Sequence, residues 1–441
     1  MLKEELVFPG DDFEFFHPAK PMISCDGINH ARHRRAVGNA FSDRALRTYE
    51  PVLVQYANKM MDTLQQYADG TPGHAVNIMD WFHFVMFDIT SALVFGKSFG
   101  NLDNGRYHPW VARVFPGMKL IAWSMVITAI PGLGRLVSCL LPKGMVTEAK
   151  HHMQSIVDMT EARRSSTSDS SLHRQTDFMD YILPNIQDGS RGREEQHKES
   201  VLSTEELYLN SQLLCIAGSE TTASLLAGAV FFLSRPESAQ HKDRLMSELR
   251  DIFASEDDIT PLKLNKATHL AAVLNECLRL YPPGAINMPR TVPPGGATID
   301  GRYVPGGAIV GIAQYAAYRS STHWTDPLVF APERWLAAGT TGNTGNKDSA
   351  GGRYANDRRD IFKPFSYGPR NCIGQNLAIA ECRLVIARLF WRFDVEVLPG
   401  QDGWAYNQRT YLSWEKPPLM VKLRRRQCSS KTKEEKEGTK T

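Results

Sequence analysis

The sequence of 441 residues has little of what marks several common classes of protein. Its formal net charge is only +3, so it carries no electrostatic signal for binding nucleic acid. Seven cysteines are scattered without a C-x-x-C pair, which argues against a disulfide framework and indicates a reducing compartment. No linker rich in Ser, Gly or Pro separates two halves. No secretory signal or membrane-spanning run is recognised at the start.

The sequence also lacks a fingerprint for a flavin or a nicotinamide. Its glycine-rich stretches do not follow a strand and open a helix, as a dinucleotide-binding turn requires. What is present is an ordinary globular composition, 42% hydrophobic and 22% charged, which is enough for a large core. Length alone would allow two or three domains.

One cysteine lies in a distinctive stretch, Phe365-Ser-Tyr-Gly-Pro-Arg-Asn-Cys-Ile-Gly374. Helical apolar spacing resumes after it, so Cys372 should lie where a loop enters a helix and should have a lowered pKa. Gly368 and Gly374 would let a flat ligand approach the backbone, and Arg370 would face an acidic edge of that ligand. These features suit a haem iron. A buried structural cysteine is an equally good interpretation of the loop alone.

A long apolar helix is the second feature. Ser203-Thr-Glu-Glu206 is a capping box that opens it, and Pro236 ends it after about 33 residues, or roughly 50 Å. The polar insertion Ala217-Gly-Ser-Glu-Thr-Thr222 lies at its middle. The Thr221 hydroxyl can compete for the Ala217 carbonyl and open a groove, beside which Glu220 and Thr221 could pass protons to bound dioxygen. The alternative is a helix kink with satisfied polar groups.

These motifs resemble those of the cytochrome P-450 family, the haem-thiolate monooxygenases. The cysteine stretch is similar to the family's Phe-x-x-Gly-x-Arg-x-Cys-x-Gly loop at every constrained position, and 217–222 is similar to its oxygen-activation motif. Glu276, Arg279 and Arg334 resemble its structural Glu-Arg-Arg triad. The motifs follow the family's order over nearly the whole chain. The finer likeness is to fungal members of secondary metabolism.

The resemblance implies roles for particular residues. Cys372 would ligate the iron of haem b, and Glu220 and Thr221 would be catalytic. The cofactor would be bound by Arg34, Ala217, Gly218, Arg290, Phe365, Gly368, Arg370 and Gly374.

Arg34 lies on a short basic helix over 30–41 and matches a propionate-binding arginine of the family. His30 stands where the family usually has tryptophan, and Arg32 and Arg35 are expected to be solvated. The anchor, first helix and opening strands that usually precede this helix in the family are not recognised. An inactive or merely haem-binding remnant is therefore one alternative.

The expected fold is mainly α with a small β region. It would form one domain over residues 1–423, with a charged and disordered tail at 424–441. Helices are predicted at 43–68, 80–95 and about 266–281, with a hairpin that turns at Asp300-Gly301. Residues 337–358 would be a surface insertion without a core. The apolar stretch between Pro109 and Pro142 would be either a lid over the substrate or a core helix.

The predicted function is monooxygenation, by hydroxylation or epoxidation, of an apolar small molecule. Electrons would come from NADPH through a separate reductase, and the protein would be a monomer. The family is usually anchored on the cytoplasmic face of the endoplasmic reticulum, but the localisation of this chain is left open. A haem-thiolate isomerase or dehydratase is a further alternative, although such relatives tend to lose the acid–alcohol pair. The substrate pocket should draw on five segments: Phe13 to Phe16, 110–130, Leu213-Leu214, Ala285-Ile286 and Tyr411-Leu412.

Overall fold

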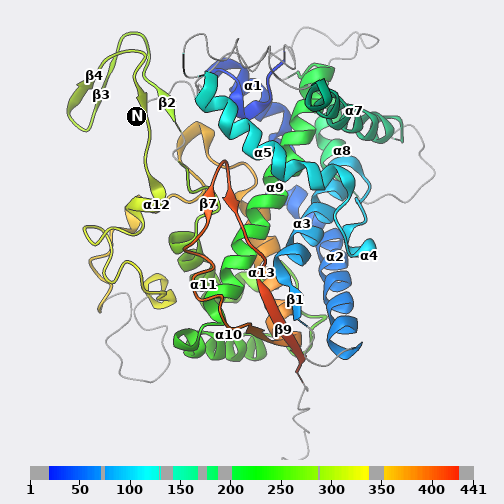
Figure 1. The fold of residues 1–441 in the computed structure, drawn as a ribbon, viewed down its shortest axis with the longest axis vertical. Helices are drawn as coiled ribbons and strands as arrows, with labels where there is room; N and C mark the ends of the chain where they lie inside the picture. The colour runs from blue at the N-terminus through cyan, green and yellow to red at the C-terminus, as the bar shows by residue number, and fades with distance from the viewer. Residues whose placement is uncertain are drawn as a thin grey trace, which may run out of the picture.

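The computed structural model describes residues 19–70, 75–128, 130, 143–166, 176–186, 201–286, 289–336 and 352–426. Over this part the chain is mainly helical, and its long helices pack around α9, which runs through the middle of the molecule (Figure 1). The α-helices are α1 (Gly27–Gly38), α2 (Asp43–Gly70), α3 (Ile78–Phe95), α4 (Asn101–Asn104), α5 (Pro109–Thr128), α7 (Lys143–Ser165), α8 (Phe178–Ile182), α9 (Thr204–Leu233), α10 (Ala239–Ile252), α11 (Thr268–Leu280), α12 (Gln314–Ala317) and α13 (Gln375–Arg392). Short 3₁₀ turns are η2 (Met22–Ser24), η3 (Asn39–Phe41), η5 (Leu183–Asn185), η7 (Pro236–Ser238), η8 (Lys263–Lys266), η9 (Pro332–Trp335), η10 (Arg359–Ile361) and η11 (Gly368–Arg370).

The strands are short and form small antiparallel sheets. They are β1 (Ala75–Asn77), β2 (Arg290–Thr291), β3 (Ala297–Ile299), β4 (Arg302–Val304), β5 (Ile309–Val310), β6 (Phe393–Val397), β7 (Arg409–Thr410), β8 (Trp414–Glu415) and β9 (Met420–Arg425). One sheet has the order β1-β9-β6, and the others pair β2 with β5, β3 with β4 and β7 with β8. The predicted hairpin is confirmed: Asp300 (φ 49°) and Gly301 (φ 75°) both take the left-handed conformation of a tight hairpin turn between β3 and β4.

Helix α9 begins as the sequence predicts. The Ser203 side chain accepts from the backbone N–H of Glu206, whose carboxylate accepts in return from the N–H of Ser203. Helices α3 and α9 are each long and apolar enough to cross a membrane, by length and composition only, and both are mostly buried inside the protein. Close packing along α9 uses its glycines, because a Cβ at Gly228 would lie 2.9 Å from the ring of Tyr281.

A cluster of buried charges joins α11 to the segment 324–357. Glu276 accepts from Arg279 at 2.7 and 2.9 Å and from Arg334 at 3.0 Å, and all three side chains are fully buried. Burial raises the pKa of the Glu276 carboxyl, but the two guanidinium groups outweigh that effect and the pKa is lowered overall. The predicted triad is therefore assembled. It has a fourth member, because Asp357 pairs with Arg334.

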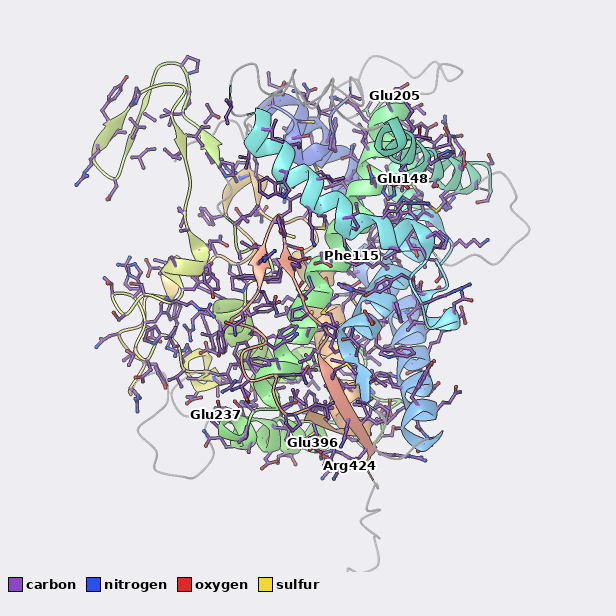
Figure 2. All side chains as sticks on the ribbon, in the orientation of Figure 1. Phe115, Glu148, Glu205, Glu237, Glu396 and Arg424 are labelled. Atoms are coloured by element: carbon purple, nitrogen blue, oxygen red, sulfur yellow. The ribbon has the colours of Figure 1, made fainter. Side chains whose placement is uncertain are left out.

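Three expectations are wrong. Residues 337–358 are not all surface insertion, since Tyr354 and Asp357 are buried at its end. The tail does not begin at 424, because β9 runs to Arg425 beside β6, and the Arg424–Glu396 pair (3.1 Å) lies at the lower end of this sheet in Figure 2. Arg32 is not solvated but pairs with Glu206 at 2.6 Å and so joins α1 to the start of α9.

We predict that Glu276→Ala prevents the protein from accumulating in folded form. The substitution leaves two buried guanidinium groups without their shared partner, at a cost of roughly 3–5 kcal/mol. Arg358→Ala is the control, since the Arg358–Asp360 pair has both side chains more than half exposed. The measurement is soluble yield and urea denaturation. A folded Glu276→Ala variant with the stability of the control would contradict the prediction.

A second prediction concerns Glu381 of α13, which is buried. Burial raises the pKa of its carboxyl from 4.5 to about 8. Between these values the unfolded chain releases a proton that the folded protein keeps, so stability falls as pH rises from about 4.5 to about 8. Glu381→Gln should remove this loss and be the more stable protein at pH 8, by a few kcal/mol at most. Urea denaturation at pH 5 and pH 8 tests it, and an unchanged difference between the two proteins at both pH values would refute it.

Candidate active site

The loop before α13 is closed by its own backbone. The N–H of Cys372 donates to the carbonyl of Phe365 at 2.8 Å, and the N–H of Asn371 donates to the carbonyl of Gly368 at 3.0 Å. Gly368 has φ 81°, a conformation that favours glycine, and a Cβ there would meet nothing within 4 Å. The loop thus holds Cys372 in one position just before the N-cap of α13, with open space beside it.

Cys372 differs from the other cysteines of the described chain. Its side chain is exposed, whereas Cys25, Cys215, Cys277 and Cys382 are buried. Desolvation nevertheless raises the pKa of the Cys372 thiol, and it outweighs the N–H of Gly374 and the charge of Arg34, which act in the opposite direction. The expectation that the helix end lowers this pKa is therefore wrong for the protein alone. A metal ion bound at this accessible thiol would reverse the effect of desolvation and hold the thiolate.

The middle of α9 has a second accessible face inside the molecule. Ala217 and Thr221 are exposed, one turn apart, on a helix whose neighbouring residues 222–233 are buried. The Thr221 hydroxyl donates to the Ala217 carbonyl at 2.7 Å, as the sequence predicts. Gly218 packs against Thr90 of α3, where an added Cβ would lie at 3.4 Å. Helix α9 packs against α13, the helix that follows the cysteine loop.

Three arginines from distant segments converge near the cysteine loop. Arg34 of α1 donates to the carbonyl and side-chain oxygens of Asn371, both at 2.6 Å, and Arg370 donates to the carbonyl of Cys25 at 2.7 Å. The third is Arg290, at the start of β2.

The charge of this cluster is evident at His30. Burial, as the largest cause, and the charges of Arg370, Arg34 and Arg290 together lower the pKa of the His30 imidazole to about 4. Burial also lowers the pKa of Arg290, with a contribution from Arg370. Three half-buried like charges near one another favour an anionic ligand at this position.

The acid of the α9 motif does not face a free space. The carboxylate of Glu220 is buried and accepts from His83 of α3 (2.8 Å), from Ser413 (2.8 Å) and from Lys416. Burial raises the pKa of the Glu220 carboxyl, but Lys416 and His83 outweigh this and lower it to about 2. Nothing in the sequence indicated these three partners, which lie far from Glu220 along the chain.

The expected substrate pocket is placed only in part. Phe13 to Phe16 lie outside the described residues. Leu213, Ala285, Ile286, Tyr411 and Leu412 are half-buried, whereas Leu214 is buried. On α5, Trp110 is buried against His152 (ring centroids 4.7 Å apart), but Leu120, Trp123 and Val126 are exposed on the surface.

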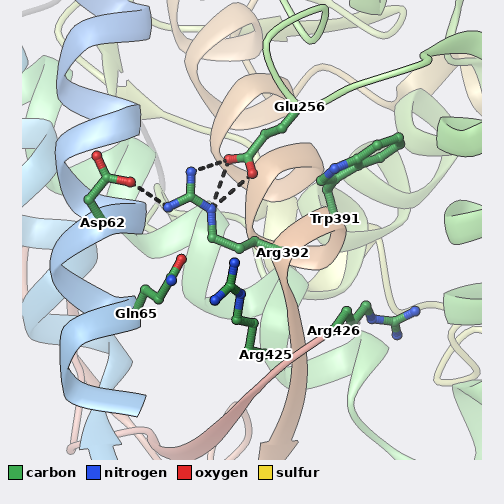
Figure 3. A pocket seen from close by; sticks show the side chains of 7 residues that line it. All are labelled: Asp62, Gln65, Glu256, Trp391, Arg392, Arg425 and Arg426. Atoms are coloured by element: carbon green, nitrogen blue, oxygen red, sulfur yellow. Dashed lines mark hydrogen bonds and ion pairs between the residues drawn. The ribbon is translucent and has the colours of Figure 1, made fainter. Parts of the chain in front are cut away.

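A polar pocket of about 280 Å³ lies elsewhere (Figure 3). It is lined by Asp62, Gln65, Glu256, Trp391, Arg392, Arg425 and Arg426. Within this pocket, Arg392 forms ion pairs with Asp62 (2.5 Å) and Glu256 (2.8 Å). Arg392 ends α13, whose other end carries the cysteine loop, so the pocket lies roughly 27 Å from that loop. It is not the candidate site.

The described geometry suits a protein that holds a flat, anionic cofactor against a cysteine sulfur. Residues 8–423 match the family described as Cytochrome P450. A cytochrome P450 monooxygenase named aclL, from Aspergillus oryzae, is 37% identical over 94% of this chain and 78% of its own length. Another from that fungus, astJ, is 38% identical over 96% of this chain and 79% of its own length. The trichothecene C-15 hydroxylase of Fusarium sporotrichioides is 36% identical over 91% of this chain and 76% of its own length.

The chain therefore belongs to the cytochrome P450 family and is a monooxygenase of that family. Membership implies a haem with a thiolate ligand, an electron donor and O₂. The family resemblance and the mainly helical fold with small sheets are both confirmed.

Proposed function

We propose that the protein inserts one oxygen atom from O₂ into an apolar small molecule, by hydroxylation or epoxidation, at a haem b ligated by Cys372. The observation that carries this proposal is the accessible thiol on a self-closed loop before α13, beside three converging arginines. A haem-thiolate centre supplies the activation of O₂ and the cleavage of its O–O bond. The two haem propionates would be bound by Arg34, Arg290 and Arg370. The negative charges of the propionates would relieve the mutual repulsion of these arginines.

The remaining cofactor contacts follow from the same arrangement. The backbone of Phe365, Gly368 and Gly374 shapes the loop under the macrocycle, and Ala217 and Gly218 would form the opposite wall. Thr221 exposes its hydroxyl on that wall while it donates to the Ala217 carbonyl. Its oxygen lone pairs are left to hold water, and Thr221 with Glu220 would govern proton delivery.

The half-buried side chains of Leu213, Ile286 and Leu412 favour an apolar skeleton held by shape. The fungal hydroxylase and monooxygenases among the relatives support a role in secondary-metabolite biosynthesis. NADPH would supply electrons through a separate reductase to a monomeric enzyme.

We predict that Cys372→Ala abolishes the red-shifted Soret band that thiolate-ligated haem gives when reduced and bound to carbon monoxide. The substitution removes the only accessible sulfur among the described cysteines. Cys25→Ala is the control, because Cys25 is buried and only its backbone carbonyl contacts Arg370. Persistence of the band in Cys372→Ala would assign the ligand elsewhere.

We also predict that Thr221→Ala keeps haem content and substrate affinity but diverts reducing equivalents to hydrogen peroxide. A side chain needed only for proton delivery changes coupling more than binding. Thr222→Val serves as the control, because Thr222 is the next residue along the helix but is buried, whereas Thr221 is exposed. Product, peroxide and NADPH consumption are measured together. Equal coupling in both variants would make Thr221 a helix-kink residue only.

A further inference from the structure

A continuous line of hydrogen bonds leads from Glu220 toward the surface of the molecule. The Nε2 atom of His83 lies 2.8 Å from Glu220 Oε2, and its Nδ1 atom lies 2.8 Å from the hydroxyl of Tyr107. That hydroxyl donates to Asp80 Oδ1 at 2.6 Å. Asp80 is only half-buried, whereas His83 and Glu220 are buried. Three proton-carrying groups therefore lead from the half-buried Asp80 to the acid of the α9 motif.

The hydrogen count along this line fixes the charge of the histidine. Tyr107 has one proton, and it is given to Asp80, so the Tyr107 oxygen must accept from His83 Nδ1–H. Lys416 independently favours the ionised form of Glu220, and an ionised carboxylate can only accept, so Glu220 must accept from Nε2–H. Both ring nitrogens then donate, which makes His83 an imidazolium. Asp80 and Glu220, with His83 and Lys416, form a balanced set of two negative and two positive charges.

The surroundings keep the line in place. The ring of Phe115 on α5 packs 4.8 Å from the ring of His83, and Figure 2 shows Phe115 over the middle of α9 and α3. The other oxygen of Asp80 accepts from the side chain of Asn77 at 2.7 Å. The side-chain oxygen of Asn77 accepts in turn from the N–H of Leu419, which ties this end to β9.

The other partners of Glu220 have a different place. Ser413 and Lys416 both donate to Oε1, and Lys416 also donates to the carbonyl of Trp414 at 3.0 Å. They hold the carboxylate against the turn after β7. Oε2 is left to His83 alone among the described contacts of Glu220.

We propose that His83, Tyr107 and Asp80 form a route that supplies protons from solvent to Glu220 during turnover. This inference rests on the proposed function, in which Glu220 and Thr221 govern proton delivery. His83 acts through Glu220 and is a positioning residue, and it touches neither substrate nor cofactor. The members of the route come from α3 and from the loop before α5.

Each transfer balances as a proton movement without any redox change. The Nε2 proton of His83 passes to Glu220 Oε2, and the bonding pair stays on nitrogen as a lone pair. Glu220 passes the proton to water held by Thr221, and the proton is consumed when O₂ is reduced in the proposed reaction. A half-turn of the imidazole then presents its bare nitrogen to Tyr107. Solvent then protonates Asp80, Asp80 protonates the Tyr107 oxygen, and Tyr107 returns its own proton to the ring.

The first test reads the histidine itself and needs no turnover. The purified haem-loaded protein, labelled with ¹⁵N at histidine, is compared with His83→Gln to assign the His83 signals. At neutral pH both ring nitrogens should show the shift of a protonated nitrogen. Tyr107→Phe should change the Nδ1 signal and leave the Nε2 signal near its original value. A bare nitrogen in the unmodified protein would overturn the proposal.

The second test follows proton supply in turnover with His83→Gln, Tyr107→Phe and Asp80→Asn. His83→Gln keeps a donor to Glu220 but cannot relay a proton, so product-coupled turnover should fall at least about tenfold, below the usual contribution of a positioned acid. The kinetic solvent isotope effect should rise, and the dependence of coupling on pH should flatten. Tyr107→Phe and Asp80→Asn should shift the same quantities in the same direction, with smaller changes.

Ser413→Ala is the matched control, since it removes an equally short hydrogen bond to Glu220 outside the route. It should leave the isotope effect and the pH profile unchanged. If it changes them as much as His83→Gln does, the partners of Glu220 only position it, and the route is refuted. All variants should keep the Soret band of thiolate-ligated haem. Absence of that band from the unmodified protein would instead refute the proposed function, whatever the ¹⁵N signals show.

Discussion

Buried ion pairs join the parts of this molecule that are farthest apart in the sequence. Glu276 and Arg334 link α11 to the segment before the cysteine loop, and Glu220 and Lys416 link the middle of α9 to the end of the chain's last hairpin. A charge buried without its partner is costly, so each pair allows one arrangement of its two segments and penalises others. The core around these ion pairs is apolar and close-packed. Apolar side chains tolerate alternative packings of the segments more readily than buried ion pairs do.

Helix α9 combines two opposite requirements. Most of it must be apolar because it crosses the core, yet its middle carries an acid and hydroxyls that need partners. The acid turns to one side, where His83, Ser413 and Lys416 satisfy it, and the hydroxyl of Thr221 satisfies itself on the Ala217 carbonyl. The helix therefore presents a small accessible polar face, whereas the buried hydroxyl of the neighbouring Thr222 has no hydrogen-bond partner among the described residues. The acid is anchored while the alcohol stays available.

The cysteine loop and the arginines illustrate a site whose chemistry is completed by its cofactor. The protein alone raises the pKa of Cys372 by desolvation and gathers three guanidinium groups around His30. A cationic metal centre would stabilise the thiolate, and two carboxylates would stabilise the arginines. One ligand that carries a cationic metal and two carboxylates would stabilise both the Cys372 thiolate and the three arginines. In the proposed function, the grouped arginines and the desolvated thiol would therefore favour binding of the haem.

The sequence by itself determined the local features: the capping box of α9, the hairpin at Asp300-Gly301, the loop around Cys372 and the Thr221 bond to Ala217. Each depends on residues within a few positions of one another, so spacing and side-chain chemistry suffice to predict it. The spacing of three residues placed Glu276 and Arg279 on one helix face, but the addition of Arg334 to this pair followed only from the family resemblance, because Arg334 lies far away in the sequence. Tertiary structure alone decided the partners that come from distant segments, such as Asp357 for Arg334 and Lys416 for Glu220. It also decided the direction of the Cys372 pKa, because desolvation depends on every segment packed around the thiol, and no local pattern records that.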